Sequence, residues 1–178
     1  ITGNNQTGQW GYDVNVAGID LSASYNPRGT AAGTKGGAET GYAIVYGGLM
    51  DGLELSAGYF DDGEEAENET FGVAYTMGAV SAAYQVTTVD YEAQASTDED
   101  ATHYGITIAV NEDLTVGAAR QEIEFDGAAD DEVNSGISAS YTMGSISIGA
   151  NMNTLESKGG SATAKDIEAT VLNIAFSF

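Results

Sequence analysis

The sequence predicts an all-β chain that folds as an antiparallel transmembrane β-barrel, and three observations favour this fold class. Apolar and polar residues alternate with a period of two along nearly the whole chain, which is typical of strands with one apolar and one polar face. Short and long connections follow one another in turn between these segments. The last segment alternates through Leu172, Ile174, Phe176 and Phe178, an apolar edge that would promote aggregation in a soluble domain.

Each expected strand is recognised by its more apolar phase, and the opposite phase is small or polar, as in Asp20, Ser22 and Ser24. The apolar phases run over 10–16, 19–25, 42–46, 53–59, 71–77, 80–86, 104–110, 114–125, 137–143, 146–152 and 172–178. No apolar run approaches the roughly 18 residues of a membrane helix, and no convincing helical stripe is present. We therefore expect about eleven strands and no helix longer than a turn.

The connections between the expected strands fall into two classes. Short turns are expected at 17–18, 49–52, 77–79, 111–113 and 143–144, and long polar loops at 27–39, 61–70, 93–102, 126–133 and 156–165. This pattern is typical of outer-membrane barrels, which have short periplasmic turns and longer external loops. Two hairpins, 74–81 and 140–147, nearly repeat each other in sequence, so a structural unit recurs along the chain.

Aromatic residues of the apolar phase gather near the ends of the expected strands. An outer group comprises Trp10, Tyr25, Tyr42, Tyr59, Phe71 and Tyr104, and an inner group comprises Tyr46, Tyr75, Tyr141 and Phe176. Amphipathic rings prefer the headgroup level of a bilayer, so two aromatic belts are expected at the two membrane interfaces. The alternative is that tyrosine is simply common in strands.

The charge of the chain is lopsided, with five Lys and Arg against 27 Asp and Glu and a formal net charge of -22. This acidity argues against nucleic acid as a partner, because its phosphates would be repelled, and it fits a protein that conducts or is surrounded by cations. The chain has no cysteine and one histidine, His103, which lies beside an acidic loop. We expect no enzymatic activity, although a Ser–His–Asp triad, as in barrel-embedded hydrolases, is formally possible.

Three short segments resemble a known family. The hairpin sequences from Gly52 to Tyr59 and from Tyr75 to Tyr84, with the ending from Ile174 to Phe178, are similar to the general porins of Gram-negative bacteria. The closest resemblance is to the acidic, Rhodobacter-type porins of alphaproteobacteria. It implies a location in the bacterial outer membrane, contact with the lipid bilayer and lipopolysaccharide, and assembly as a homotrimer.

The resemblance also implies that residues 1–178 form one porin barrel domain that is incomplete at its N-terminus. Porins of this kind have roughly 16 strands, so about eleven strands would be the sixth to the last. The segment from Ile1 to Gly8 would then be the tail of the family's constriction loop. An N-terminal fragment of the same porin is expected to supply the missing strands as a partner.

The function implied is passive diffusion of ions and small hydrophilic solutes, with a preference for cations. Acidic residues of the polar phase are the candidates for lining the pore: Asp13, Asp20 and Glu54. Arg120 is a further candidate, since it is the only basic residue within an expected strand, but its facing is ambiguous because Ala118 and Ala119 blur the alternation. The alternative function is a soluble, secreted, acidic β-protein that binds calcium.

Acidic clusters in the long loops are candidates for a metal site. Ca²⁺ takes six to eight oxygen ligands, and neighbouring loops can supply them jointly. The candidate ligands are Asp98, Asp100, Asp130 and Asp131. Porins of the resembling group carry calcium on their loops, which favours the prediction, whereas a hydrated acidic rim neutralised by diffuse cations stays open as the alternative. No cofactor is required for the proposed activity.

Overall fold

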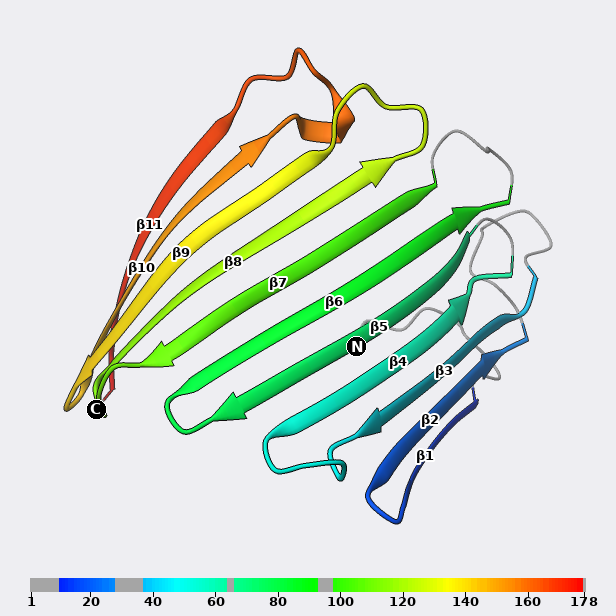
Figure 1. Cartoon of the computed structure of the whole chain (residues 1–178), viewed down its shortest axis with the longest axis horizontal. Coiled ribbons are helices and arrows are strands. Elements are labelled where there is room, and N and C mark those ends of the chain that lie inside the picture. Colours follow the sequence, from blue (N-terminus) through cyan, green and yellow to red (C-terminus); the bar gives the residue numbers. More distant parts are fainter. Residues whose placement is uncertain (1–9, 28–36, 64–65, 93–97, 178) are drawn as a thin grey trace.

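The computed structural model describes residues 10–27, 37–63, 66–92 and 98–177, and within them it forms one antiparallel sheet of eleven strands (Figure 1). The strands pair in chain order without a crossover, so the all-β prediction and the expected strand number are confirmed. They are β1 (Trp10–Val16), β2 (Ile19–Asn26), β3 (Glu39–Tyr46), β4 (Leu53–Asp61), β5 (Ala66–Met77), β6 (Val80–Tyr91), β7 (Glu99–Ala109), β8 (Leu114–Phe125), β9 (Glu132–Met143), β10 (Ile146–Glu156) and β11 (Ile167–Phe176).

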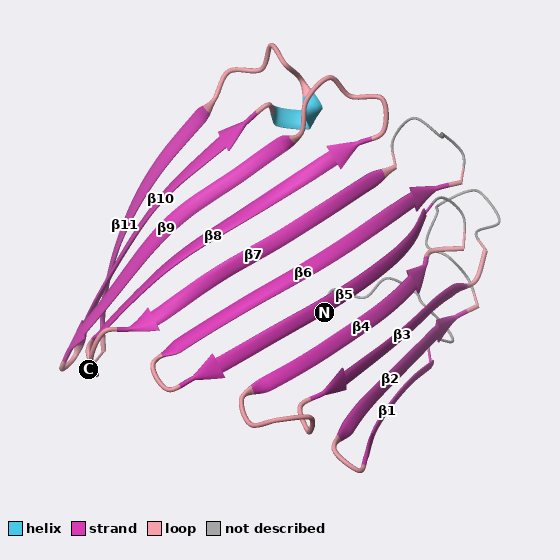
Figure 2. Cartoon of the chain, viewed as in Figure 1, coloured by secondary structure: helices cyan, strands magenta, loops and turns pink. Residues whose placement is uncertain are grey.

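Strand structure covers most of the described chain, and a short 3-10 helix, η1 (Lys158–Gly160), lies between β10 and β11 (Figure 2). No helix in the ranges that the structure describes has the length and apolar character to cross a membrane. The segment from Ile1 to Gly8 and the last residue, Phe178, on which two expectations rested, lie outside those ranges.

The pairing register gives the sheet one apolar and one polar face. Direct cross-strand partners have the same character, as with Val14 and Leu21 on one face and Asp13 and Ser22 on the other. The pairing continues without a bulge from β1 to β11, so the period of two is kept across the whole sheet. A slip of one residue would exchange the faces, and the hydrophobic pattern therefore specifies this register strongly.

The apolar face is not covered by any other part of the described chain. Trp10 is 73% exposed and Phe176 is 61% exposed, and Val133, at 8%, is the only buried hydrophobic residue within the described ranges. The sheet thus lacks the core of a soluble domain, and its strands are joined by main-chain ladders. Such a face requires an apolar medium or an apolar partner.

Tight turns join the strands at one edge of the sheet, which we call the short-turn end. Ala17 and Gly18 both have positive φ angles, 55° and 83°, as a two-residue hairpin loop of the favoured hand requires. In the turn before β8, the Asn111 side-chain oxygen accepts hydrogen bonds from the amides of Asp113 and Leu114, each at 2.9 Å. The opposite edge, the long-loop end, carries the longer connections.

Several strands begin earlier than the sequence analysis expected, including β9 at Glu132 and β11 at Ile167. β5 begins at Ala66 and β7 at Glu99, inside segments expected to be loops at 61–70 and 93–102. Their first residues pair fully, as Glu67 does with Asp61 on one side and Asp90 on the other. Acidic residues have low strand propensity, but the main-chain ladder extends through them because the adjacent strands β6 and β8 are each twelve residues long.

Two connections at the long-loop end are bonded to each other. The amides of Ala129 and Asp130, between β8 and β9, donate to the carbonyl oxygen of Gly160 at 3.2 Å each. The Gly159 amide donates to Glu132 Oε2 at 2.7 Å. Gly160 is buried, with a φ of 70°. This corner of the rim is therefore held by two main-chain hydrogen bonds between the loops and by one bond to the Glu132 carboxylate.

Candidate functional site

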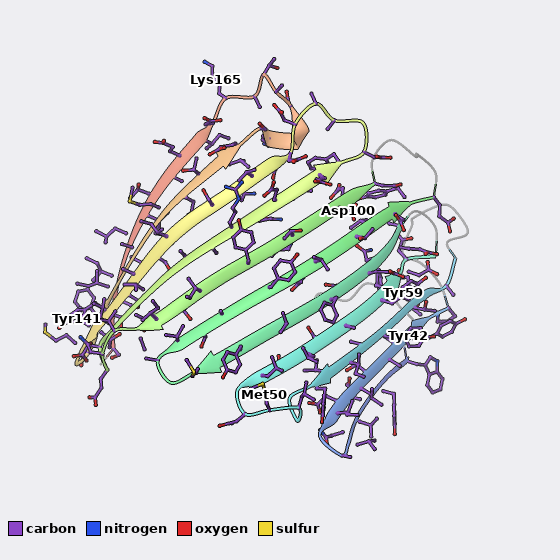
Figure 3. All side chains as sticks on the ribbon, in the orientation of Figure 1. Tyr42, Met50, Tyr59, Asp100, Tyr141 and Lys165 are labelled. Carbon is purple, nitrogen blue, oxygen red and sulfur yellow. The ribbon has the colours of Figure 1, made fainter. Side chains whose placement is uncertain are left out.

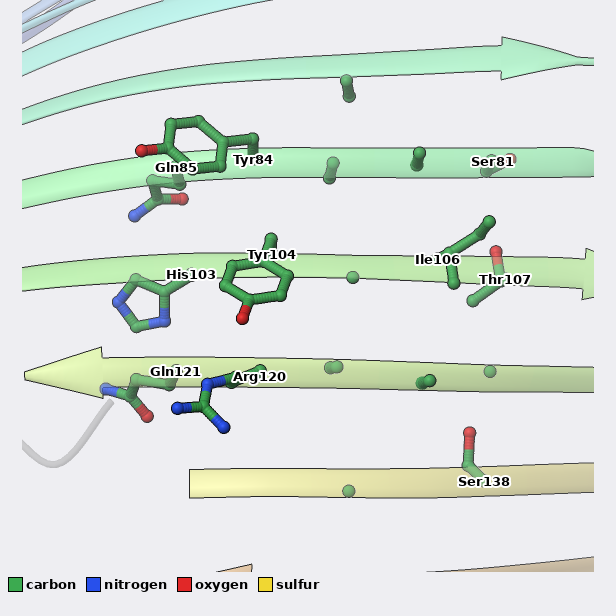
Figure 4. A pocket seen from close by; sticks show the side chains of 18 of the residues that line it. Ser81, Tyr84, Gln85, His103, Tyr104, Ile106, Thr107, Arg120, Gln121 and Ser138 are labelled. Atoms are coloured by element: carbon green, nitrogen blue, oxygen red, sulfur yellow. The ribbon is translucent and has the colours of Figure 1, made fainter. Parts of the chain in front are cut away.

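The candidate site is the polar face of the sheet, which carries an open groove of about 870 Å³. The sheet is curved, and because the groove lies on the polar face this face is its concave side (Figure 1). The groove spans β4 to β10, and its side chains include Gln85, His103, Thr107, Gln121 and Ser138 (Figure 4). The site is therefore a broad wall of hydrogen-bonding groups and not an enclosed pocket.

Three of the four pore-lining candidates lie on this polar face. Asp13 pairs with Ser22, and Asp20 pairs with Asn15, whose side-chain amide donates to Asp20 Oδ1 at 2.7 Å. Glu54 borders the groove together with its neighbour on the same face, Ser56. Asp20 and Glu54 stand at the short-turn ends of β2 and β4, so both bring negative charge to that edge of the wall.

The fourth candidate, Arg120, whose facing the sequence left open, is in phase with the apolar face of the sheet. Arg120 pairs directly with Tyr104 and with Ser135, and the residues in phase with it on β8 are Ala118 and Glu122. Its guanidinium Nη2 lies 3.4 Å from Glu122 Oε2, forming a half-exposed ion pair. Arg120 is among the residues that border the groove, although it is in phase with the apolar face. The sequence did not reveal which face Arg120 occupies, because Ala118 and Ala119 before it give no apolar–polar alternation.

The aromatic residues expected in belts lie on the apolar face. Tyr42 pairs with Tyr59, and Trp10 with Tyr25, so the expected neighbours are in direct register. Figure 3 shows Tyr42 and Tyr59 toward the long-loop end and Tyr141 at the short-turn end. Aromatic rings thus lie toward both ends of the apolar face, as expected at two membrane interfaces, but Phe71 and Tyr104 of the expected outer group stand in the middle of β5 and β7.

The middle of the wall carries uncharged polar side chains of which the sequence analysis singled out only His103. Gln85, His103, Gln121 and Asn134 form one continuous cross-strand row over β6 to β9. On β5 to β10 the charged residues of the polar face are Glu99 and Glu132, both the first residues of their strands. The candidates for lining the pore were chosen by charge, so this row was missed. Its members all lie in the polar phase, and pairing the hairpins places them side by side.

The same register argues against a catalytic histidine. His103 stands between Gln85 and Gln121 in the row, and its side chain has neither a serine nor a carboxylate as its direct cross-strand partner. A Ser–His–Asp triad requires both within hydrogen-bond reach of the ring. The register instead places His103 among the polar residues that line the wall.

An acidic hollow of about 420 Å³ lies at the long-loop end and gathers three of the four candidate calcium ligands. Asp98, Asp100 and Asp131 line it, and Asp130 does not. Asp100 Oδ1 accepts a hydrogen bond from Thr88 at 2.7 Å, and Asp98 Oδ1 accepts one from the Tyr91 amide at 2.8 Å. Among the described residues, no group of three or more His, Asp or Glu side chains stands close enough to hold a metal ion. Calcium binding stays a prediction.

Comparisons with known proteins agree with this geometry. The family model described as Gram-negative porin matches residues 1–178. A search of curated proteins gave no match. Among solved structures, a porin refined at 1.8 Å resolution is similar, with 19% identity and a TM-score of 0.69 over 94% of this chain and 60% of that one.

Two further solved structures share the fold. OccK11 (OpdR) of Pseudomonas aeruginosa has 9% identity and a TM-score of 0.65, covering 95% of this chain and 66% of that one. OmpT of Vibrio cholerae, expressed in the outer membrane, has 18% identity and a TM-score of 0.62, covering 93% and 61%. At these identities the likeness shows the fold alone, and the chain spans about 60% of the porin's length.

The family match covers every strand of the sheet and accounts for its uncovered apolar face, which a membrane covers. The alternative of a soluble secreted protein is therefore wrong. An outer-membrane location also explains why the aromatic residues gather at both ends of the apolar face. The chain belongs to the Gram-negative porin family and is an outer-membrane protein.

Proposed function

We propose that this protein forms a passive diffusion channel for ions and small hydrophilic solutes in the outer membrane. One observation carries the proposal: a curved antiparallel sheet whose outward face exposes large apolar side chains and whose concave face carries an open groove lined with hydrogen-bonding side chains. When such a sheet closes in a bilayer, it encloses a water-filled lumen lined by its polar phase. Solutes then pass according to size and charge, without turnover or an energy source.

We propose that the channel prefers cations. Asp20 and Glu54 stand at the short-turn end of the wall, Asp13 lies within it, and Glu99 and Glu132 stand at the long-loop end. Carboxylates at both mouths raise the local cation concentration and repel anions. The preference weakens with added salt, because the Debye length falls from about 10 Å at 0.1 M to about 3 Å at 1 M.

The reversal potential of the full-length protein in a planar bilayer tests this proposal. Under a KCl gradient, a cation-selective channel gives a potential of the sign set by K⁺, and its magnitude decreases as the mean salt concentration rises. A potential of the sign set by chloride overturns the selectivity. The absence of any stepwise conductance from correctly folded protein overturns the channel itself.

A closed barrel requires further strands beside β1 and β11, which each have one neighbour in the described sheet. Unpaired main-chain groups are too costly in lipid for an open edge to persist. We propose that N-terminal strands of the same porin, on the same chain or on a companion fragment, close the barrel. Mass spectrometry of protein purified from the outer membrane would test this: a single species of 18.3 kDa contradicts it.

We further propose that three such barrels assemble as a homotrimer in contact with lipopolysaccharide, and that the protein is closest to the Rhodobacter-type porins. The large exposed apolar surface supports an apolar partner or lipid around the barrel. Light scattering in mild detergent checks the oligomeric state. A monodisperse monomer contradicts the trimer but leaves the channel proposal intact.

A further inference from the structure

The polar wall contains a shallow trough that has a floor of small residues and, among the described residues, is lined by no acidic, lysine or arginine side chain. Its floor is a cross-strand row of the smallest residues, Ala83, Gly105, Ala119 and Gly136, in direct register over β6 to β9. A Cβ atom built on Gly105 would lie 3.3 Å from the Ala119 Cβ and 3.2 Å from the Ala118 carbonyl oxygen. The floor is therefore closely packed, and larger side chains at these glycines would disturb it.

Hydrogen-bonding side chains form the two sides of this trough. The side nearer the long loops is the row Gln85, His103, Gln121 and Asn134, and the other side carries Ser81, Thr107, Ser138 and Asn151. Each row lies two residues from the floor, which is about 6.6 Å along a strand, so the sides stand about 13 Å apart. Four strands give the trough a length of about 14 Å.

Several of these groups are available to a solute. Among the described residues, the side chains of His103, Gln121, Asn151 and Asn153 make no hydrogen bond or ion pair. Asn153 continues the floor row beyond Gly136, where its side-chain oxygen contacts the position of a Cβ on that glycine. An amide both donates and accepts, so each of these residues can exchange hydrogen bonds with a hydroxyl group.

We infer that this trough is a weak subsite for uncharged polyhydroxylated solutes, the class of mono- and disaccharides. A sugar ring presents hydroxyl groups around its edge and C–H groups on its faces. The glycine and alanine floor accepts a C–H face, while the amide and hydroxyl rows bond the edge. The absence of charge between the rows gives ions no comparable advantage there. The trough is the central part of the open groove of about 870 Å³, a volume within the range of small-molecule sites.

This inference rests on the proposed channel, because the trough meets solutes only if the sheet lines a lumen. Sucrose is the probe, and a short polyethylene glycol of similar size is the control probe, since it has few hydroxyl groups. We expect sucrose to lower the K⁺ current of the full-length protein in a planar bilayer in a saturable manner. The glycol lowers it only in proportion to the bulk conductivity.

Matched variants assign the effect to the trough. Ala119→Leu fills the floor and abolishes the saturable block, whereas Ala118→Leu makes the same change on the opposite face of β8 and retains it. Gln121→Leu removes one neutral hydrogen-bonding partner and weakens the block roughly 2- to 12-fold. Heat-modifiable migration on a detergent gel shows whether each variant has folded, and Gln121→Leu keeps the test decisive if Ala119→Leu does not fold.

The outcomes separate the two proposals. A K⁺ current that sucrose and the glycol lower equally overturns the trough and leaves the channel standing. The trough is also overturned, with the channel intact, if folded Ala119→Leu or Gln121→Leu retains the full block of the unmodified protein. Folded protein without any K⁺ current overturns the channel and the trough together.

Discussion

A lysine placed on either face of β7 tests which face of the sheet meets lipid. Ile106 and Thr107 are adjacent, and both lie near the middle of the apolar run from Tyr104 to Val110. Ile106 shares the apolar face with Ala82 and Ala118, while Thr107 lies opposite Ser81 and Gly117 on the polar face. The two positions therefore have nearly the same depth in the membrane and differ in what surrounds the side chain.

The expected destabilisation follows from that difference. A lysine on the lipid face of a barrel costs about 2–4 kcal/mol near the bilayer midplane. Ile106→Lys should lower the folding equilibrium constant by a factor of roughly 30 to 1,000, since each 1.4 kcal/mol is tenfold. Thr107→Lys places the same charge in water and should change the free energy of unfolding by less than about 1 kcal/mol, as surface substitutions usually do.

Urea titration of the full-length protein refolded into lipid vesicles measures both values, with tryptophan fluorescence as the probe of folding. The two variants carry equal charge, so a general effect of the added lysine cancels between them. Equal destabilisation by the two lysines would refute the assignment of the faces. A larger cost for Thr107→Lys would mean that the lumen and lipid sides are exchanged.

Three further predictions concern the mouths and the loops. Asp20→Asn and Glu54→Gln should each reduce the cation preference slightly in reversal-potential measurements, whereas Asp98→Asn should reduce it mainly at low salt, where screening is weak. An unchanged preference in all three variants would mean that residues outside this wall determine the selectivity. Millimolar Ca²⁺ should raise the thermal unfolding temperature, and the double variant Asp98→Asn, Asp131→Asn should lose this rise. The control double variant Glu112→Gln, Asp113→Asn, at the short-turn end, should keep it. An equal rise in both variants excludes the acidic hollow as the site. Gly159→Ala should lower the free energy of unfolding by about 1–2 kcal/mol because of its φ of 66° alone. Gly160→Ala should lower it more, because its Cβ would also lie 2.9 Å from the Asp130 carbonyl oxygen. Hydrogen exchange at the amides of Ala129 and Asp130 measures the difference, and equal protection in the two variants would refute the role of packing there.

The sequence was sufficient to predict the strands within the membrane and their order. The alternation through residues such as Ile146, Ile148 and Met152 places every second side chain on one face, and short turns force neighbours in sequence to pair. Both signals are local, so they can be read without knowing the rest of the fold. The face of Asp13, Asp20 and Glu54 followed from the same alternation.

Features that depend on pairing between distant segments were not predictable in this way. The strand starts at Ala66 and Glu99 lie in acidic segments that look like loops, and only the length of the partner strands draws them into the ladder. The facing of Arg120 required its partner Tyr104, because alanines give no alternation signal. The hydrogen bond between Gly159 and Glu132 depends on the path of a loop that no periodicity describes.

In the described sheet, each strand pairs only with the strands before and after it in the chain. This has a consequence for how such barrels change over evolution. Insertion or loss of one hairpin leaves all other pairings intact and alters only the circumference of the wall. The hairpins at 74–81 and 140–147, which share five of eight residues, are similar enough for such a unit to have been duplicated. Lumen width is thus open to change in steps of two strands, while each existing hairpin keeps the sequence that pairs it.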